Sequence, residues 1–227
     1  MSAVDEESTV EVARSTSERG ELVLRRRADG ALELRANGVF VMDTVETSTE
    51  RALATRALEL HPAPASVLVG GLGLGFTLRA VLEDDRVERV TVAEIEDALV
   101  GWARDGTVPG GDVLADPRVT VAVGDVADVL RDSAGSTYDL VLLDVDNGPG
   151  YLVHDANAEL YRAPALEQAR RVTRPGGTVV VWSAAEAPDL LAAMGGVFGR
   201  RRSEAVAYDV ALQGRAERYW LYVGHVG

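Results

Sequence analysis

The sequence predicts an α/β protein with a doubly wound, seven-stranded mixed sheet, and three observations support this prediction. Short apolar runs rich in β-branched residues alternate with helical segments between residues 66 and 197, a pattern typical of parallel strands covered by helices on both faces. Four consecutive strands of this series end in glycine or in an acidic residue. Two alternating runs close the chain, and the short joint at residues 213–215 suits a hairpin rather than a helical crossover. We therefore expect five parallel strands followed by an antiparallel pair.

The first 45 residues are predicted to form a flexible tail followed by a small β-element. Residues 1–20 contain no apolar core, so we interpret them as a tail and not as a secretory signal. Over residues 21–45, leucines alternate with charged side chains on both sides of a turn at residues 28–30. This alternation is typical of a β-hairpin with one apolar face, and the hairpin element precedes the main domain.

Residues 46–227 are predicted to form a single nucleotide-binding catalytic domain. Thr47 and Glu50 have the spacing of a capping box, which places the start of an apolar-striped helix there and its end near Leu60. The expected strands are 66–69, 87–94, 118–125, 138–144 and 178–182 in the parallel part, and 205–212 and 217–223 in the closing pair.

The turn after the first parallel strand carries the strongest signal for a ligand. Within Val67–Leu82, a buried strand leads through a glycine-rich turn into an apolar helix. Gly71, Gly73 and Gly75 leave the turn without side chains, so that a sugar can approach the backbone closely, and the amides at the helix start point toward such a ligand. Glu94 ends the next strand 19 residues after Gly75, a spacing that suits a carboxylate accepting from two ribose hydroxyls. The turn and this acid together predict a nucleoside site.

Acidic residues follow the other strands at the same edge of the predicted sheet. Asp125 ends the third parallel strand, and Asp144 ends the fourth. Ligands of open α/β sheets bind beyond the carboxyl ends of the strands, so Glu94, Asp125 and Asp144 should meet in one site. For Asp125 alone, a cap on the following helix is an alternative. Three acids at successive strand ends are better explained by a ligand than by three helix caps.

Composition limits the kinds of partner and site. The chain has 227 residues, a net charge of −13, three histidines and no cysteine. The acidic balance argues against nucleic acid as a partner; it serves solubility first and also favours a cationic substrate. Without thiols and with scattered histidines, we expect no metal site. No apolar stretch approaches the ~20 residues of a membrane span, so we expect no membrane partner and a cytoplasmic location.

The motifs GGLGLG, VAEIE, GD, LLD and RPGG, in this order and followed by a closing hairpin, resemble the Rossmann-like fold of the class I S-adenosylmethionine-dependent methyltransferases. Within that fold the chain is similar to the spermidine synthases, which are polyamine aminopropyltransferases, from about Leu34 to Val223. The resemblance implies a transferase of polyamine biosynthesis that moves an aminopropyl group from decarboxylated S-adenosylmethionine to a small-molecule amine. It also implies an S-adenosylmethionine-type domain over residues 46–227, and it suggests a homodimer.

The resemblance assigns roles to the strand ends. It implies cofactor-binding roles at the nucleoside and sulfonium for Gly71, Gly73 and Gly75, at the ribose hydroxyls for Glu94, and at the adenine amino group for Asp125. Asp144 stands where the family has its catalytic aspartate. A free alkylamine is mostly protonated at pH 7, whereas transfer to nitrogen needs the nitrogen lone pair. A carboxylate at hydrogen-bond distance would therefore act as the general base.

The segment after Asp144 departs from the family pattern. Spermidine synthases usually read Asp-Ser-Ser-Asp-Pro here, with the second acid helping to hold the diamine. This chain reads Asp-Val-Asp-Asn-Gly-Pro, so an asparagine takes the position of the second acid unless the preceding aspartate substitutes for it. The substrate-binding candidates of this loop are Asp146, Asn147, Tyr151, His154 and Asp155. Trp182, at the end of the fifth strand, either lines the acceptor pocket or packs in the core.

Three alternative functions stay open at this point. On the same fold, a methyltransferase would use intact S-adenosylmethionine, and Arg51 or Arg56 would then be candidates to bind the carboxylate of that donor. An NAD-dependent dehydrogenase would need glycine where Phe76 stands, and it does not account for the closing hairpin. The third alternative is a degenerate homologue that binds a nucleoside without catalysis, although the presence of Asp144 argues against it.

Overall fold

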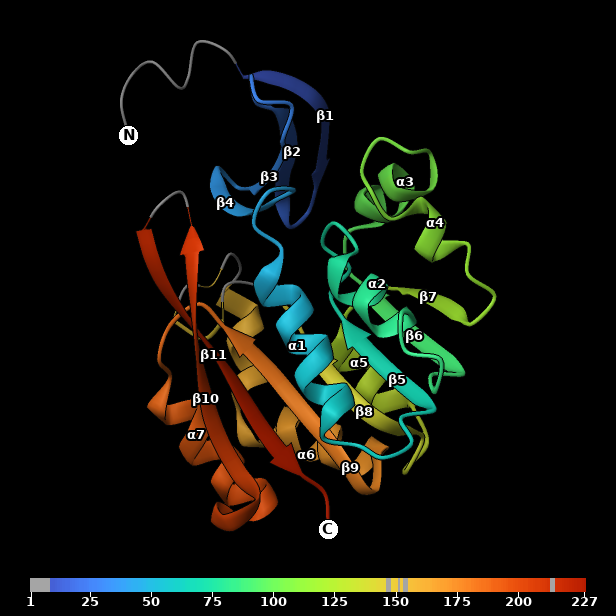
Figure 1. The fold of residues 1–227 in the computed structure, drawn as a ribbon, viewed down its shortest axis with the longest axis vertical. Coiled ribbons are helices and arrows are strands. Elements are labelled where there is room, and N and C mark those ends of the chain that lie inside the picture. Colours follow the sequence, from blue (N-terminus) through green and yellow to red (C-terminus); the bar gives the residue numbers. More distant parts are fainter. Residues whose placement is uncertain (1–8, 146–147, 151, 153–154, 213–214) are drawn as a thin grey trace.

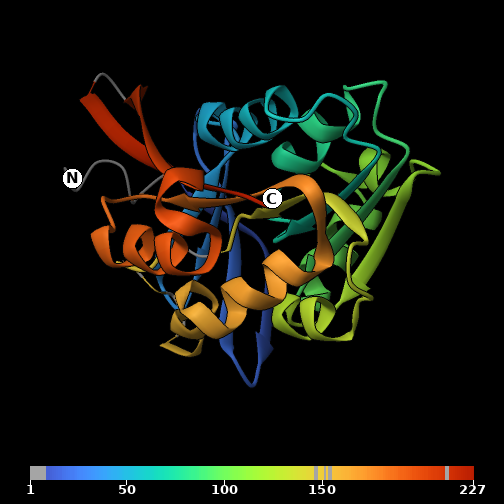
Figure 2. The same ribbon diagram turned by 90° about the horizontal axis from the view of Figure 1, so that it is seen from below.

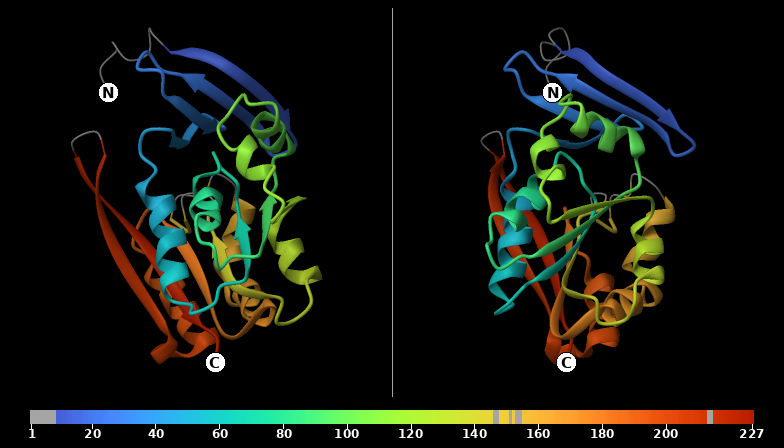
Figure 3. Two further views of the ribbon diagram at one scale, coloured as in Figure 1. Left: turned by 45° about the vertical axis from the view of Figure 1, so that its right-hand side comes forward. Right: turned by 90° about the vertical axis from the view of Figure 1, so that its right-hand side faces the viewer.

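The computed structural model describes residues 9–145, 148–150, 152, 155–212 and 215–227, which form two β-sheets and the helices that cover them (Figure 1). A four-stranded antiparallel sheet forms the N-terminal part, and a seven-stranded sheet forms the centre of the remainder. The N-terminal sheet lies across one end of the larger sheet (Figure 3). No helix of the described ranges is long and apolar enough to cross a membrane.

The N-terminal sheet begins within the segment that we expected to be a tail. Its strands, in spatial order, are β1 (Val10–Ser17), β2 (Gly20–Arg26), β3 (Leu32–Ala36) and β4 (Val39–Asp43). The prediction of a flexible tail over residues 1–20 is therefore wrong for residues 10–17. Most side chains of β1 are exposed, and the alternation of Val10, Glu11 and Val12 soon gives way to a polar run, so the sequence marks this strand only weakly. It is held by its antiparallel backbone pairing with β2, which a reading of side-chain pattern does not detect.

One apolar core joins the N-terminal sheet to the main domain. Leu22 and Leu24 of β2 and Leu34 of β3 are buried in the same cluster as Leu53, which lies on the first helix, and Leu72 of the glycine-rich turn. Burying such side chains stabilises a fold by roughly 1.5–3 kcal/mol each. The small sheet is therefore a fixed wall of the main domain.

The large sheet confirms the predicted architecture of five parallel strands and a terminal antiparallel pair. Its spatial order is β10-β11-β9-β8-β5-β6-β7, with β5 (Ser66–Gly70), β6 (Arg89–Glu94), β7 (Val119–Val123), β8 (Tyr138–Leu143), β9 (Thr173–Ser183), β10 (Ser203–Leu212) and β11 (Arg215–His225). Strands β5 to β9 are parallel, whereas β11 runs antiparallel to both β9 and β10. Starting from β5, the chain adds β6 and then β7 on one side, and afterwards β8 and then β9 on the other side. This change of direction lies beside β5, where ligands of such sheets bind.

Alternating residues of the central strands bury opposite faces of the sheet. Val67 and Val69 of β5 belong to one apolar cluster, and Leu68 between them belongs to the other, as a strand covered on both sides requires. Helices α1 and α2 cover one face, and α5, α6 and α7 cover the opposite face (Figure 2). The helices are α1 (Ser48–Glu59), α2 (Phe76–Leu82), α3 (Asp97–Arg104), α4 (Gly111–Leu114), α5 (Val126–Asp132), η1 (Asp155–Tyr161), α6 (Ala163–Val172), α7 (Pro188–Met194), η2 (Gly195–Gly199) and η3 (Arg200–Arg202).

Candidate active site

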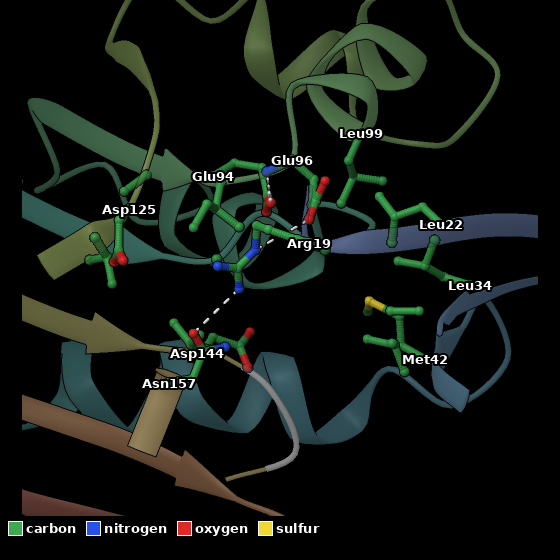
Figure 4. Close-up of a pocket in the computed structure, with 18 of the residues that line it drawn as sticks. Arg19, Leu22, Leu34, Met42, Glu94, Glu96, Leu99, Asp125, Asp144 and Asn157 are labelled. Carbon is green, nitrogen blue, oxygen red and sulfur yellow. Dashed lines mark hydrogen bonds and ion pairs between the residues drawn. The ribbon is translucent and has the colours of Figure 1, made fainter. Parts of the chain in front are cut away.

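A cavity lies where the carboxyl ends of the central strands meet the N-terminal sheet (Figure 4). The cavity opens to solvent, and its empty space, open mouth included, is about 1040 Å³. Leu22, Leu34 and Met42 of the N-terminal sheet form an apolar wall. The strand ends contribute Gly71, Gly73, Glu94, Asp125 and Asp144. The structure thus brings together the predicted acids and two of the three predicted glycines.

The two glycines in the cavity have positive φ angles, a backbone conformation that disfavours a side chain. Gly71 has φ +95°, and a Cβ on it would lie 2.1 Å from the backbone oxygen of Asp144. Gly73 has φ +51°, and its Cβ would lie 2.7 Å from Sδ of Met42. At Gly71 the backbone of the β8 end leaves no room for a Cβ, whereas at Gly73 the positive φ is the main reason for glycine, because the Met42 side chain can move. Gly75 is different, since it caps α2 against Gly110 and does not line the cavity among the described residues.

Glu94 is oriented by the glycine-rich turn. Its side chain is buried, Oε2 accepts the Leu72 amide at 2.8 Å, and Oε1 accepts the Glu96 amide at 2.8 Å. Burial raises the pKa of Glu94, while these amides favour its charged form. The Gly73 amide also favours the charged form. A carboxylate has about four lone-pair sites, so Glu94 keeps acceptor capacity for a ligand hydroxyl.

Asp125 is both the cap of a helix and a lining residue of the cavity, the two roles that the sequence left open. Its Oδ1 accepts the Ala127 amide at 2.8 Å, which makes it the N-cap of α5. The same residue lines the cavity next to Gly124 and Val126. A helix cap fixes its carboxylate at the edge of the cavity, which is compatible with contact to a ligand.

Asp144 lies at the end of β8 with its carboxylate held in place. Thr77 Oγ1 donates to Asp144 Oδ2 at 2.6 Å, and the Asp144 amide donates to the Gly70 carbonyl at 2.8 Å. Burial of the carboxyl raises the pKa of Asp144 to about 6, although the Thr77 hydroxyl favours the charged form. A carboxylate with such a pKa is a stronger base than an ordinary aspartate while it remains mostly ionised at neutral pH.

A second carboxylate of the cavity, Glu50, was not predicted. The sequence suggested a capping box, but Thr47 makes no side-chain capping bond, and Glu50 lines the cavity instead. Thr49 Oγ1 donates to Glu50 Oε2 at 2.8 Å. Burial first, and the charge of Asp144 second, raise the pKa of Glu50 to about 7. The capping-box interpretation is therefore wrong, because the residue at N3 turns toward the cavity and not toward the helix start.

Arg19 is a further cavity residue that the sequence analysis missed, because we assigned it to the tail. It projects from the turn between β1 and β2 into the cavity (Figure 4). Its Nε lies 3.4 Å from Glu96 Oε1, and its Nη2 donates to Asn157 Oδ1 at 3.4 Å. Arg19 thus joins the N-terminal sheet to the start of α3 and to η1. The turn at residues 17–20 would have been predicted from the sequence only together with strand β1.

The charged residues of the cavity are mostly acidic. Among the described lining residues, Arg19 is the single basic one, whereas the acids are Glu50, Glu94, Glu96, Asp125 and Asp144. The two arginines proposed for a carboxylate-bearing donor lie elsewhere: Arg51 is exposed, and Arg56 pairs with Glu204 at 3.4 Å. The cavity is therefore better suited to cationic ligands than to anionic ones.

Most of the substrate-binding candidates of the predicted acceptor loop lie outside the described residues. Asp146, Asn147, Tyr151 and His154 lie outside the described residues, and Asp155 opens η1 with only its backbone described. Trp182 does line the cavity. Its ring stacks on that of Tyr219, with centroids 5.5 Å apart and an interplanar angle of 25°. An aromatic wall therefore stands on the β9 side of the cavity.

Comparisons with known proteins agree with this geometry. Residues 46–192 match the family model described as "Spermine/spermidine synthase domain". Spermidine synthase 1 of Pisum sativum is 33% identical over 150 residues, which cover 62% of this chain and 43% of that protein. Putrescine N-methyltransferase 3 of Nicotiana tabacum is 29% identical over 153 residues, which cover 66% of this chain and 36% of that protein. The chain thus spans less than half the length of these curated relatives.

Solved structures support the fold. The spermidine synthase of Thermotoga maritima superposes with a TM-score of 0.80 at 19% identity, over 96% of this chain and 73% of that one. A spermidine synthase in complex with the transition-state analogue AdoDATO gives a TM-score of 0.81 at 18% identity, over 96% and 74% of the two chains. These likenesses confirm the predicted class I methyltransferase-type fold.

Proposed function

Because the chain belongs to the spermine/spermidine synthase family, we propose that it transfers an aminopropyl group from decarboxylated S-adenosylmethionine to an amine acceptor. One observation carries this proposal: Asp144, a carboxylate without an ion pair among the described residues, lies in an acidic cavity directly against the glycine-rich turn. Both proposed substrates are cations, and an acidic cavity attracts them.

The nucleoside of the donor would occupy the β5–β7 side of the cavity. Gly71 and Gly73 line the cavity without side chains, so the sugar and the sulfonium could approach the backbone of the turn closely. Glu94 would accept from the ribose hydroxyls, since its oxygens are fixed by backbone amides and retain free lone pairs. Asp125 would accept from the adenine amino group at the cavity edge.

Asp144 would prepare the acceptor nitrogen. An ammonium loses its proton to the Asp144 carboxylate, and the freed lone pair attacks the carbon attached to the sulfonium sulfur. The new N–C bond forms as the C–S bond breaks, and the electron pair of that bond goes to sulfur, which leaves as a neutral thioether. Thr77 would keep the carboxylate aligned for this step through its 2.6 Å hydrogen bond.

Methyl transfer from intact S-adenosylmethionine is the second candidate, because putrescine N-methyltransferases are relatives of this chain at 29% identity. The same base and nucleoside contacts would serve that reaction. The intact donor carries a carboxylate, however, and the described cavity offers only Arg19, which Glu96 already pairs. The charge balance therefore favours the decarboxylated donor, and identifying the products formed with each donor by mass separates the two reactions.

The pH dependence of turnover should reveal the base. Since burial raises the pKa of Asp144 to about 6, activity should rise with pH through about 6 as the carboxyl ionises. Thr77→Val removes the hydroxyl that favours the charged form, so the rising limb should move to higher pH. Thr120→Val, on an exposed position of β7, is the matched control and should leave the profile unchanged. A limb near pH 4 in the unmodified protein would contradict this assignment.

A further inference from the structure

Two carboxylates that line the cavity, Glu50 and Asp144, make no ion pair with a basic residue of the described ranges. Each accepts a hydrogen bond from a threonine hydroxyl, Glu50 from Thr49 and Asp144 from Thr77. The other three acidic side chains of the cavity are instead held by an arginine or by backbone amides. A neutral hydroxyl offsets less negative charge than a cation does. The charge of this pair is therefore largely uncompensated.

The hydroxyl of Thr77 links the segments that carry the two acids. Its Oγ1 donates to Asp144 Oδ2 at 2.6 Å and lies 3.5 Å from the backbone oxygen of Glu50. Helix α1, which carries Glu50 in its first turn, also packs against β8, and Asp144 directly follows that strand. The two carboxylates thus enter one cavity from adjacent elements. At such a site a negative charge on one acid opposes a second charge on the other.

The other charged and titratable groups near Glu50 do not relieve this repulsion. Burial first, the charge of Asp144 second, and more weakly that of Glu46, raise the pKa of Glu50. Burial, and with it the charge of Glu50, raises the pKa of Tyr219, so that this phenol stays neutral. Arg19, the basic residue among the described lining residues, is already in an ion pair. Glu50 and Asp144 therefore act on each other without a neutralising charge between them.

We propose that Glu50 is a positioning residue that acts through Asp144: once ionised, its negative charge makes Asp144 a stronger base. The proposal rests on the proposed function for the role of Asp144. When the N–H bond of the acceptor ammonium breaks, its proton forms an O–H bond on Asp144, and one of two neighbouring negative charges disappears. Because this relieves their repulsion, an ionised Glu50 favours the transfer of the proton.

The coupling predicts that turnover rises with pH in two steps. Asp144 ionises first, since burial raises its pKa only to about 6. Glu50 ionises next, with a pKa of about 7, because burial and the charge already present on Asp144 oppose its ionisation. Activity should therefore rise as the base forms, and should rise again as the ionised Glu50 strengthens that base.

Kinetic profiles of Glu50 variants test the second step. With decarboxylated S-adenosylmethionine and 1,4-diaminobutane, Glu50→Gln should keep only the first step, and its kcat at the alkaline plateau should fall about threefold or more, because the base is weaker. The KM for the amine should change less than the kcat does. Glutamine retains an oxygen that accepts from Thr49, so thermal stability should be unchanged. Glu50→Asp should restore the second step, and Glu59→Gln, exposed on the same helix, should keep both.

Titration of carboxyl carbons by NMR tests the coupling apart from activity. In the full chain without substrates, the Glu50 signal is assigned by its loss in Glu50→Gln and should titrate near pH 7. In Asp144→Asn its midpoint should lie about one pH unit lower, the size of interaction that couples two titrations. An unchanged midpoint would overturn the proposal, as would a Glu50→Gln profile that retains both steps. If the midpoint falls but no aminopropyl product forms, the proposed function fails and the coupling of the two acids stands.

Discussion

Asp144→Asn should lower turnover by about 10²–10⁴-fold, the usual contribution of a positioned general base. The variant keeps the shape of the side chain, and its amide oxygen can still accept from Thr77, so the β8 end and the cavity should stay intact. What is lost is the ability to take the proton from the acceptor ammonium. Steady-state turnover at saturating donor and acceptor gives the measurement.

Two comparisons make this result specific to the base. Methylthioadenosine affinity should change less than twofold, because Asp144 belongs to the acceptor side of the cavity. Asp85→Asn, an exposed position in the loop before β6, should keep full turnover. If Asp144→Asn also keeps full activity on its acceptor, Asp144 is a structural residue that holds Thr77, and the proposed mechanism is wrong.

Glu94→Ala should weaken methylthioadenosine binding by tenfold or more while the protein remains folded. The carboxylate is the proposed acceptor for two ribose hydroxyls, and a hydrogen bond to a charged group contributes about 1.5–3 kcal/mol. It also holds the Leu72 and Glu96 amides, so part of the loss should come from a less ordered turn. Calorimetry with methylthioadenosine measures the sum.

Glu94→Gln separates the two contributions. Its amide oxygen can satisfy one of the two backbone donors, so the turn should be less affected than in the alanine variant, whereas the second acceptor is lost. Glu88→Ala, exposed just before β6, is the matched control. Unchanged affinity in both Glu94 variants would mean that the nucleoside binds elsewhere.

The parts of the fold that the sequence predicts are those in which a side-chain pattern coincides with a backbone requirement. The apolar runs at β5 and β8 have the length and composition of strands buried on both faces, and the glycines at 71 and 73 mark a turn with a positive φ at both positions. Acidic residues stand at or just after the ends of three of these strands, and parallel strands bring their carboxyl ends to the same edge of the sheet. For this reason the large sheet and the positions of Glu94, Asp125 and Asp144 were predictable.

The parts that were missed depend on tertiary contacts. Strand β1 has few buried side chains and exists through its pairing with β2, so Arg19 in the turn between them was assigned to a tail. Glu50 has the spacing of a capping residue, and only the packing of α1 over β8 turns it toward the cavity. Gly75 shares the motif of Gly71 and Gly73, yet its neighbours belong to the segment around Gly110.

The identity of the donor is tested most directly by identifying the reaction products by mass. The protein is incubated separately with decarboxylated and with intact S-adenosylmethionine, each with a panel of di- and polyamines. The acidic cavity, with its single basic residue already paired among the described lining residues, predicts that the acceptor gains one aminopropyl unit and only with the decarboxylated donor. A methyl gain from the intact donor, with no aminopropyl product from the other, would contradict it.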